Sequence, residues 1–148
     1  MQTESARMSS TAEARFRIQA PNSASRVAKI VALDEESENV VRALSADSWN
    51  QATFFTAATF IRNLTAEVAT ADLVVMVATP GGRAGIASRI GEACSARRVT
   101  TTALIVGAAT ASEDALSETL AQVRPWSLMV VVATADDYIH DMLTALRA

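Results

Sequence analysis

One stretch limits the possible folds of this chain more than any other: residues 71–107, which read ADLVVMVATPGGRAGIASRIGEACSARRVTTTALIVG. An apolar run leads into a glycine-rich turn at residues 79–85, a helical pattern follows, and a second apolar run begins at Thr100. A strand, a tight turn, a helix and a second, parallel strand form a βαβ unit. Open α/β sheets bind their ligands at such strand-to-helix turns.

The same alternation extends along the rest of the chain. Aromatic residues make up only 5% of the sequence, so small branched residues must build the core, as they do in parallel strands buried on both faces. We therefore predict an α/β fold: a three-layer sandwich with a mainly parallel, Rossmann-like doubly wound sheet of about five strands. The strands are expected at residues 27–33, 52–56, 73–78, 100–106 and 128–133. Helices are expected at residues 35–44 and 57–70, after the glycine turn, from Ser112, and from Asp136 and Asp137.

The length of 148 residues suits one domain with a full core. Residues 1–24 are rich in Ser, Ala, Thr and Arg and are expected to form a flexible tail, with a single α/β domain at residues 25–148. Within the tail, residues 14–20 alternate Phe16 and Ile18 with polar side chains. This piece could be a short edge strand or a docking arm.

The charge balance disfavours nucleic acid and membranes as partners. Thirteen basic and 16 acidic residues give a net charge of −3, without a basic cluster. No apolar run approaches the ~20 residues of a membrane span, and the first residues lack the apolar core of a secretory signal. The single cysteine, Cys94, excludes an intramolecular disulfide and fits a reducing compartment. We expect a cytoplasmic protein in which Cys94 is a buried structural thiol.

The candidate ligand site lies where the strands end. Gly81 and Gly82 let the backbone approach a ligand closely, Gly85 could open a helix whose free N–H groups favour an anion, and Arg83 could add positive charge. A turn that needs glycine only for its geometry is the alternative. Neither a GxGxxG nor a GxxxxGK[ST] motif is present. The predicted cofactor-binding residues, for a nucleotide or another anion, are Asp34, Thr79, Gly81, Gly82, Arg83, Gly85 and Asp136.

The turn after the first strand is acidic rather than glycine-rich. Asp34 is followed by Glu35, Glu36 and Glu38, which would repel a phosphate. These carboxylates could hold a divalent cation, but a helix cap at Asp34 with acidic residues in the first turn explains them more simply. Capping alone predicts that asparagine replaces Asp34 at almost no cost.

Catalytic patterns are missing from the sequence. His140 is the only histidine and lies on the expected last helix, so a structural role is favoured over that of a general base. No His/Cys cluster suggests zinc, and no nucleophile elbow is present. A phosphate-accepting receiver is disfavoured, because the third strand ends in Ala78 and Thr79 without an acceptor aspartate. We expect neither catalysis nor a metal.

Taken together, four segments resemble the N-terminal nucleotide-binding half of the FtsZ and tubulin-like family. Residues 37–42 (SENVVR) are similar to its SNAV-type helix start, residues 72–78 (DLVVMVA) to its DLVF strand, residues 81–85 (GGRAG) to its GGGTGTG loop, and residues 128–132 with Asp136 and Asp137 to the strand and base-contacting turn. The resemblance implies a tubulin-like nucleotide-binding fold, without the half that completes a GTPase.

Two functions follow as hypotheses. The first is a non-catalytic domain that acts through protein contacts or self-association. The alternative is a small-molecule or phosphate-binding protein or enzyme that uses the loop at residues 81–85. Nucleic acid and membrane are not expected as partners.

Overall fold

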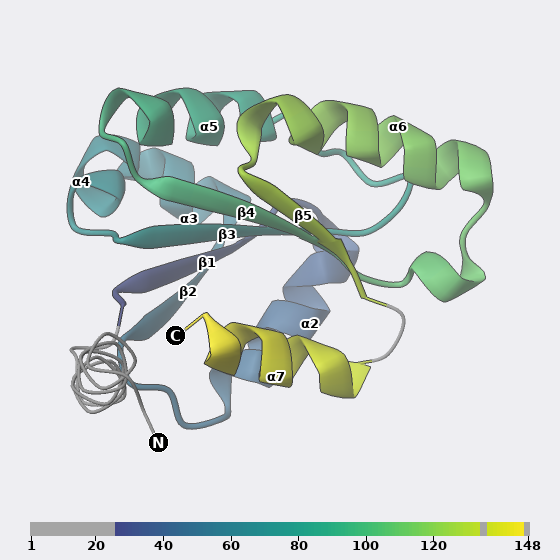
Figure 1. Ribbon diagram of the computed structural model, residues 1–148, viewed down its shortest axis with the longest axis horizontal. Coiled ribbons are helices and arrows are strands. Elements are labelled where there is room, and N and C mark those ends of the chain that lie inside the picture. The colour runs from purple at the N-terminus through teal and green to yellow at the C-terminus, as the bar shows by residue number, and fades with distance from the viewer. Residues whose placement is uncertain (1–25, 134–135, 147–148) are drawn as a thin grey trace, which may run out of the picture.

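A computed structural model describes residues 26–133 and 136–146, apart from the side chains of residues 136–138. Its five strands form one fully parallel sheet (Figure 1). All five strand predictions are confirmed to within two residues at each end. The strands are β1 (Ala28–Ala32), β2 (Ala52–Thr56), β3 (Leu73–Ala78), β4 (Thr100–Ile105) and β5 (Met129–Val132).

Helices connect the strands, and the region predicted as one helix at residues 57–70 contains two. The backbone leaves helical geometry at Asn63, with φ −125° and ψ 38°, so the chain turns there and a second short helix begins. The helices are α2 (Glu35–Ser45), α3 (Ala57–Arg62), α4 (Leu64–Ala69), α5 (Ala87–Ala96), α6 (Glu113–Val123) and α7 (Asp136–Ala145), with 3₁₀ turns η1 (Ala108–Thr110) and η2 (Arg124–Trp126).

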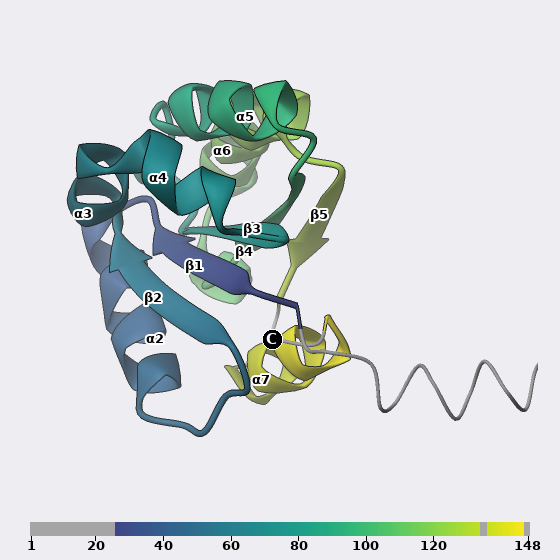
Figure 2. The same ribbon diagram turned by 90° about the vertical axis from the view of Figure 1, so that its left-hand side faces the viewer.

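The helices cover both faces of the sheet. The core on one face takes buried side chains from α3, α4, α5 and α6, and the core on the other face takes them from α2 and α7. Figure 2 shows these two helical layers on either side of the strands. Strand β3 is buried along its whole length, because both of its faces are covered. The predicted three-layer, doubly wound α/β fold is confirmed.

The strand order is β2-β1-β3-β4-β5. This is the order of flavodoxin-like sheets, whereas the other common doubly wound order has the third strand at the edge. The direction of winding reverses between β1 and β3, which pair from Ala28 with Leu73 to Ala32 with Val77. Ligands of open sheets bind beyond the carboxyl ends of the strands at such a reversal. Asp34 and Thr79, which follow β1 and β3, therefore meet there.

One buried cation joins β1 to α4. The Lys29 side chain is 9% exposed, and its Nζ lies 3.0 Å from Oε2 of Glu67 and 3.0 Å from Oγ1 of Thr70. The ring of Phe55 adds a cation–π contact at 5.7 Å. The only lysine of the chain is thus a structural element of the core.

Two sequence predictions concern residues that the structure does not describe. The tail at residues 1–24 and the docking arm at residues 14–20 lie outside the described ranges. Within those ranges, every helix is too short or too polar to cross a membrane.

Candidate functional site

A cleft of about 600 Å³ lies beyond the carboxyl ends of β1 and β3. Five of the predicted ligand residues line it, which the strand reversal explains. They are Asp34, Thr79, Gly81, Gly82 and Arg83. Gly85 is not among its lining residues, and the side chain of Asp136 is outside the described part of the chain. That these residues bind a ligand stays a prediction.

Asp34 lines this cleft, and both oxygens of its carboxylate already accept hydrogen bonds within the protein. Oδ1 accepts hydrogen bonds from the Ser37 amide at 2.8 Å and from the Thr79 hydroxyl at 2.9 Å. Oδ2 accepts one from the Thr79 amide at 2.8 Å. Ser37 completes a capping box by accepting from the Asp34 amide at 3.2 Å. The predicted helix cap is confirmed, and the same carboxylate also ties the end of β1 to the end of β3.

Three backbone amides of the glycine turn are likewise bonded within the protein. The Gly81 amide donates to the Thr119 hydroxyl at 2.9 Å, and the Ala84 amide donates to Oε1 of Gln122 at 3.1 Å. The Gly82 amide donates to the carbonyl of Thr79 at 3.1 Å. An anion site of the P-loop kind needs free N–H groups. Here Thr119 and Gln122 of α6 accept hydrogen bonds from two of these N–H groups, so those two are not free for an anion.

Glycine is required in this turn for two different reasons. Gly81 has φ +83°, a conformation that other residues adopt only with strain. Gly82 has an ordinary backbone but no room, because a Cβ atom there would lie 2.6 Å from Oδ2 of Asp34. The turn is therefore shaped by its contact with the Asp34 carboxylate.

We expect Gly82→Ala to lower the free energy of unfolding by about 1–3 kcal/mol, since the new methyl group overpacks against a carboxylate fixed by three hydrogen bonds. Urea denaturation would measure the loss. In an Asp34→Ala background the carboxylate is gone and only the Cβ atom of residue 34, at 3.1 Å, remains close, so the same substitution should cost less. Equal costs in both backgrounds would contradict this explanation.

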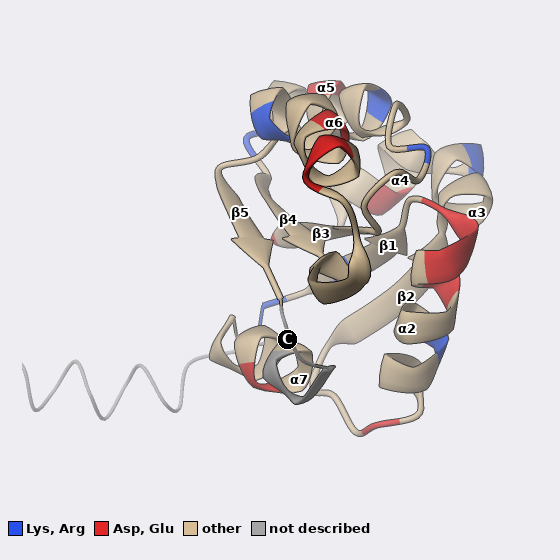
Figure 3. Ribbon diagram, turned by 90° about the vertical axis from the view of Figure 1, so that its right-hand side faces the viewer, with Lys and Arg blue, Asp and Glu red and all other residues tan. Residues whose placement is uncertain are grey.

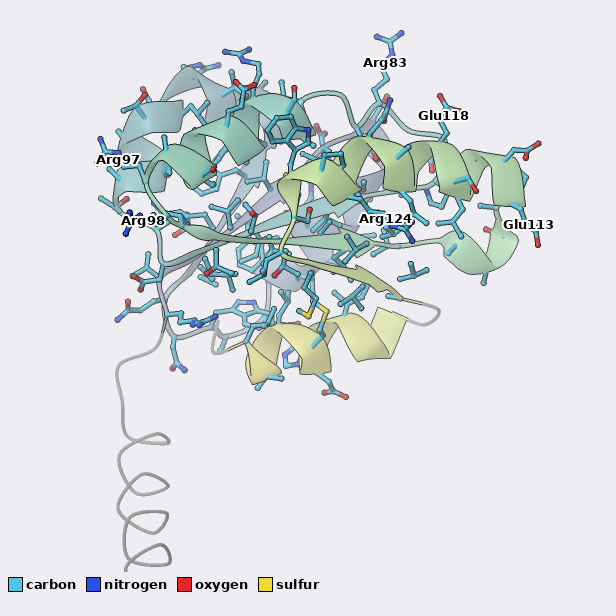
Figure 4. All side chains as sticks on the ribbon, turned by 45° about the horizontal axis from the view of Figure 1, so that its top comes forward. Arg83, Arg97, Arg98, Glu113, Glu118 and Arg124 are labelled. Atoms are coloured by element: carbon cyan, nitrogen blue, oxygen red, sulfur yellow. The ribbon has the colours of Figure 1, made fainter. Side chains whose placement is uncertain are left out.

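The rim of the cleft is mainly acidic. Glu35 and Glu36 are exposed in the first turn of α2, and Figure 3 shows the acidic residues gathered there. Arg83 is also exposed, and Figure 4 shows it extending away from the body of the domain. In the described residues, no group of three His, Cys, Asp or Glu side chains could hold a metal ion.

The contacts of His140 and the burial of Cys94 both indicate structural roles for these residues. The rings of His140 and Trp49 are in tilted contact, with centroids 4.8 Å apart, and Nε2 of His140 lies 3.7 Å from Oδ2 of Asp47. These contacts join α7 to the loop between α2 and β2. Cys94 is fully buried, and this desolvation raises the pKa of its thiol to about 11, which leaves it protonated and unreactive near neutral pH.

Sequence reasoning missed the surface at the outer edge of β5. Leu128 is 80% exposed, Met129 41% and Val132 39%, and within the described ranges these are all of the exposed large hydrophobic side chains. The run LMVVVA signals a strand but does not say that the strand lies at an edge, since strand order depends on contacts far apart in the sequence.

Comparison with known proteins gives structural likeness but no match of sequence or family. No protein-family model matches the chain, and no curated protein sequence matches it. Among solved structures, the chain is similar to the signal receiver domain of NarL, a response-regulator protein from Mycobacterium tuberculosis. The two are 16% identical, with a TM-score of 0.47 over 82% of this chain and 95% of that one.

These findings correct the resemblance to FtsZ and tubulin, which is wrong. The sheet order β2-β1-β3-β4-β5 is the flavodoxin-like one. The short motifs misled because a buried strand followed by a glycine turn is common to most doubly wound folds. The expectation of a nucleotide has no support either: the amides of Gly81, Gly82 and Ala84 are bonded within the protein.

Proposed function

We propose that this domain acts through contacts with protein chains, by self-association and without catalysis. One observation carries the proposal: the exposed large hydrophobic side chains of the described residues all lie at positions 128–132, on one edge of the sheet. Contiguous exposed apolar surface on a folded domain marks an interaction site.

The edge strand itself adds to this argument. Proteins normally protect sheet edges with charges, prolines or covering loops, because an open edge pairs with other strands. Residues 128–133 contain neither a charge nor a proline. At the opposite edge, β2 carries polar Thr53 as its most exposed side chain, so the two edges differ in character.

Sedimentation velocity over a range of concentrations tests the proposal. We expect a reversible dimer whose population rises with concentration. Leu128→Glu should weaken it strongly with little effect on the fold, because this side chain is 80% exposed. Thr53→Glu adds the same charge to the other edge strand and should leave association unchanged. A strictly monomeric chain at every concentration would overturn the proposal.

A further inference from the structure

We infer that the partner is a second copy of this chain, joined by two-fold antiparallel pairing of the two β5 strands and oriented by Glu113 and Arg124 of α6. The inference rests on the proposed function and specifies its interface. Figures 2 and 3 show β5 at the border of the sheet, with no described element beyond it.

The sequence of β5 is self-complementary in such a pairing. Val130 packs on the core that α6 covers and Val131 on the core that α7 covers, so the alternation of the strand places Leu128 and Val132 on the α6 side. A two-fold axis at Val130 sets Leu128 of one copy opposite Val132 of the other. The two exposed side chains on this face then cover one another, twice per dimer.

Glu113 and Arg124 of α6 lie on the side of the helix that, in this pairing, faces the α6 helix of the other copy. Leu116, Leu120 and Val123 of the helix face the core, and Thr119 and Gln122 face the glycine turn. At 100° per residue, the remaining flank beside β5 carries Glu113 at its start and, eleven residues later, Arg124 just past its end.

Both residues of this flank are exposed. Neither takes part in an ion pair within the described residues. Figure 4 shows Glu113 at the start of α6 and the Arg124 side chain beneath the helix, with Glu118 directed elsewhere.

A two-fold axis turns this layout into two matched ion pairs. The axis sets the two α6 helices antiparallel, so Glu113 of each copy lies toward Arg124 of the other. Adjacent strands are about 4.8 Å apart, which places helices above the paired edges about 10–15 Å apart, within reach of Arg and Glu side chains. In a pair of identical copies the two-fold axis itself sets opposite charges against each other, whereas a partner of different sequence would need a separate set of matching charges. The surface is therefore complementary to itself.

Charge reversal tests the arrangement on the full chain. Glu113→Arg alone and Arg124→Glu alone each place like charges together, and each should weaken self-association at least about tenfold. Mixing the two variants should restore it as a heterodimer, because the arginines of the first then face the glutamates of the second. This rescue also excludes misfolding as the cause. Glu118→Arg, the same charge change on the far side of the helix, is the matched control and should leave association unchanged.

Each other result overturns the inference. Association lost in Leu128→Glu but unaffected by either reversal would reject the two-fold arrangement while the proposed function stands. Association unaffected by all three variants would place self-association on another surface. A monomeric chain throughout, as expected if another protein or residues 14–20 of the same chain occupied the β5 edge, would overturn the inference and the proposed function together.

Discussion

Replacing Asp34 by alanine is expected to lower the free energy of unfolding by about 2–4 kcal/mol. The helix cap accounts for about 1 kcal/mol of this loss. The remainder arises because Thr79, which is only 7% exposed, loses the acceptor for both its amide and its hydroxyl. Urea denaturation followed by circular dichroism would measure the change.

Asparagine separates the two roles of Asp34. A cap needs only one side-chain oxygen, so capping alone predicts that Asp34→Asn is nearly neutral. The structure predicts a loss of about 1–3 kcal/mol, because one carboxylate oxygen becomes an NH₂ group that faces a donor, either at Ser37 or at Thr79. Wild-type stability in Asp34→Asn would show that the bridge to β3 contributes nothing.

The sequence allows the helix cap at Asp34 to be predicted, but not the hydrogen bonds between Asp34 and Thr79. The sequence DEES contains every local signal for the start of α2, since capping involves residues three apart. Thr79 lies 45 residues further along the chain, and only the pairing of β1 with β3 brings it to the carboxylate. Local motifs are visible in one sequence, whereas contacts set by strand order are not.

Contacts between distant residues also decide whether the glycine turn can bind an anion. The sequence predicts Gly81 and Gly82 at the end of a buried strand, and in the structure both line a cleft. The sequence could not reveal that Thr119 and Gln122, on a helix nearly 40 residues away, already bond to the amides of this turn. An anion-binding turn and a merely structural one have similar glycines and differ in what their amides contact.

A second large loss of stability is expected when the buried Lys29 ammonium loses its counter-charge. Glu67→Ala should lower the free energy of unfolding by about 2–3 kcal/mol, although alanine favours helices, because it leaves the Lys29 ammonium buried without its counter-charge. Lys29→Met should cost less than about 1 kcal/mol. Its apolar side chain fills the same volume, and the Glu67 carboxylate, which is 25% exposed, can turn to water.

The difference between the stability losses of Glu67→Ala and Lys29→Met is the test of this explanation. A simple count of ion pairs assigns both variants the same loss, because each removes one partner of a single pair. The difference in burial predicts a larger loss for Glu67→Ala than for Lys29→Met, since the stranded Lys29 side chain is only 9% exposed whereas Glu67 is 25% exposed. Urea denaturation of Glu67→Ala, Lys29→Met and the double variant gives all the necessary free energies. In the double variant the stranded ammonium is absent, so most of the Glu67→Ala loss should disappear. Equal losses for the two single variants would mean that Lys29 reaches solvent in solution and that its charge is not part of the core.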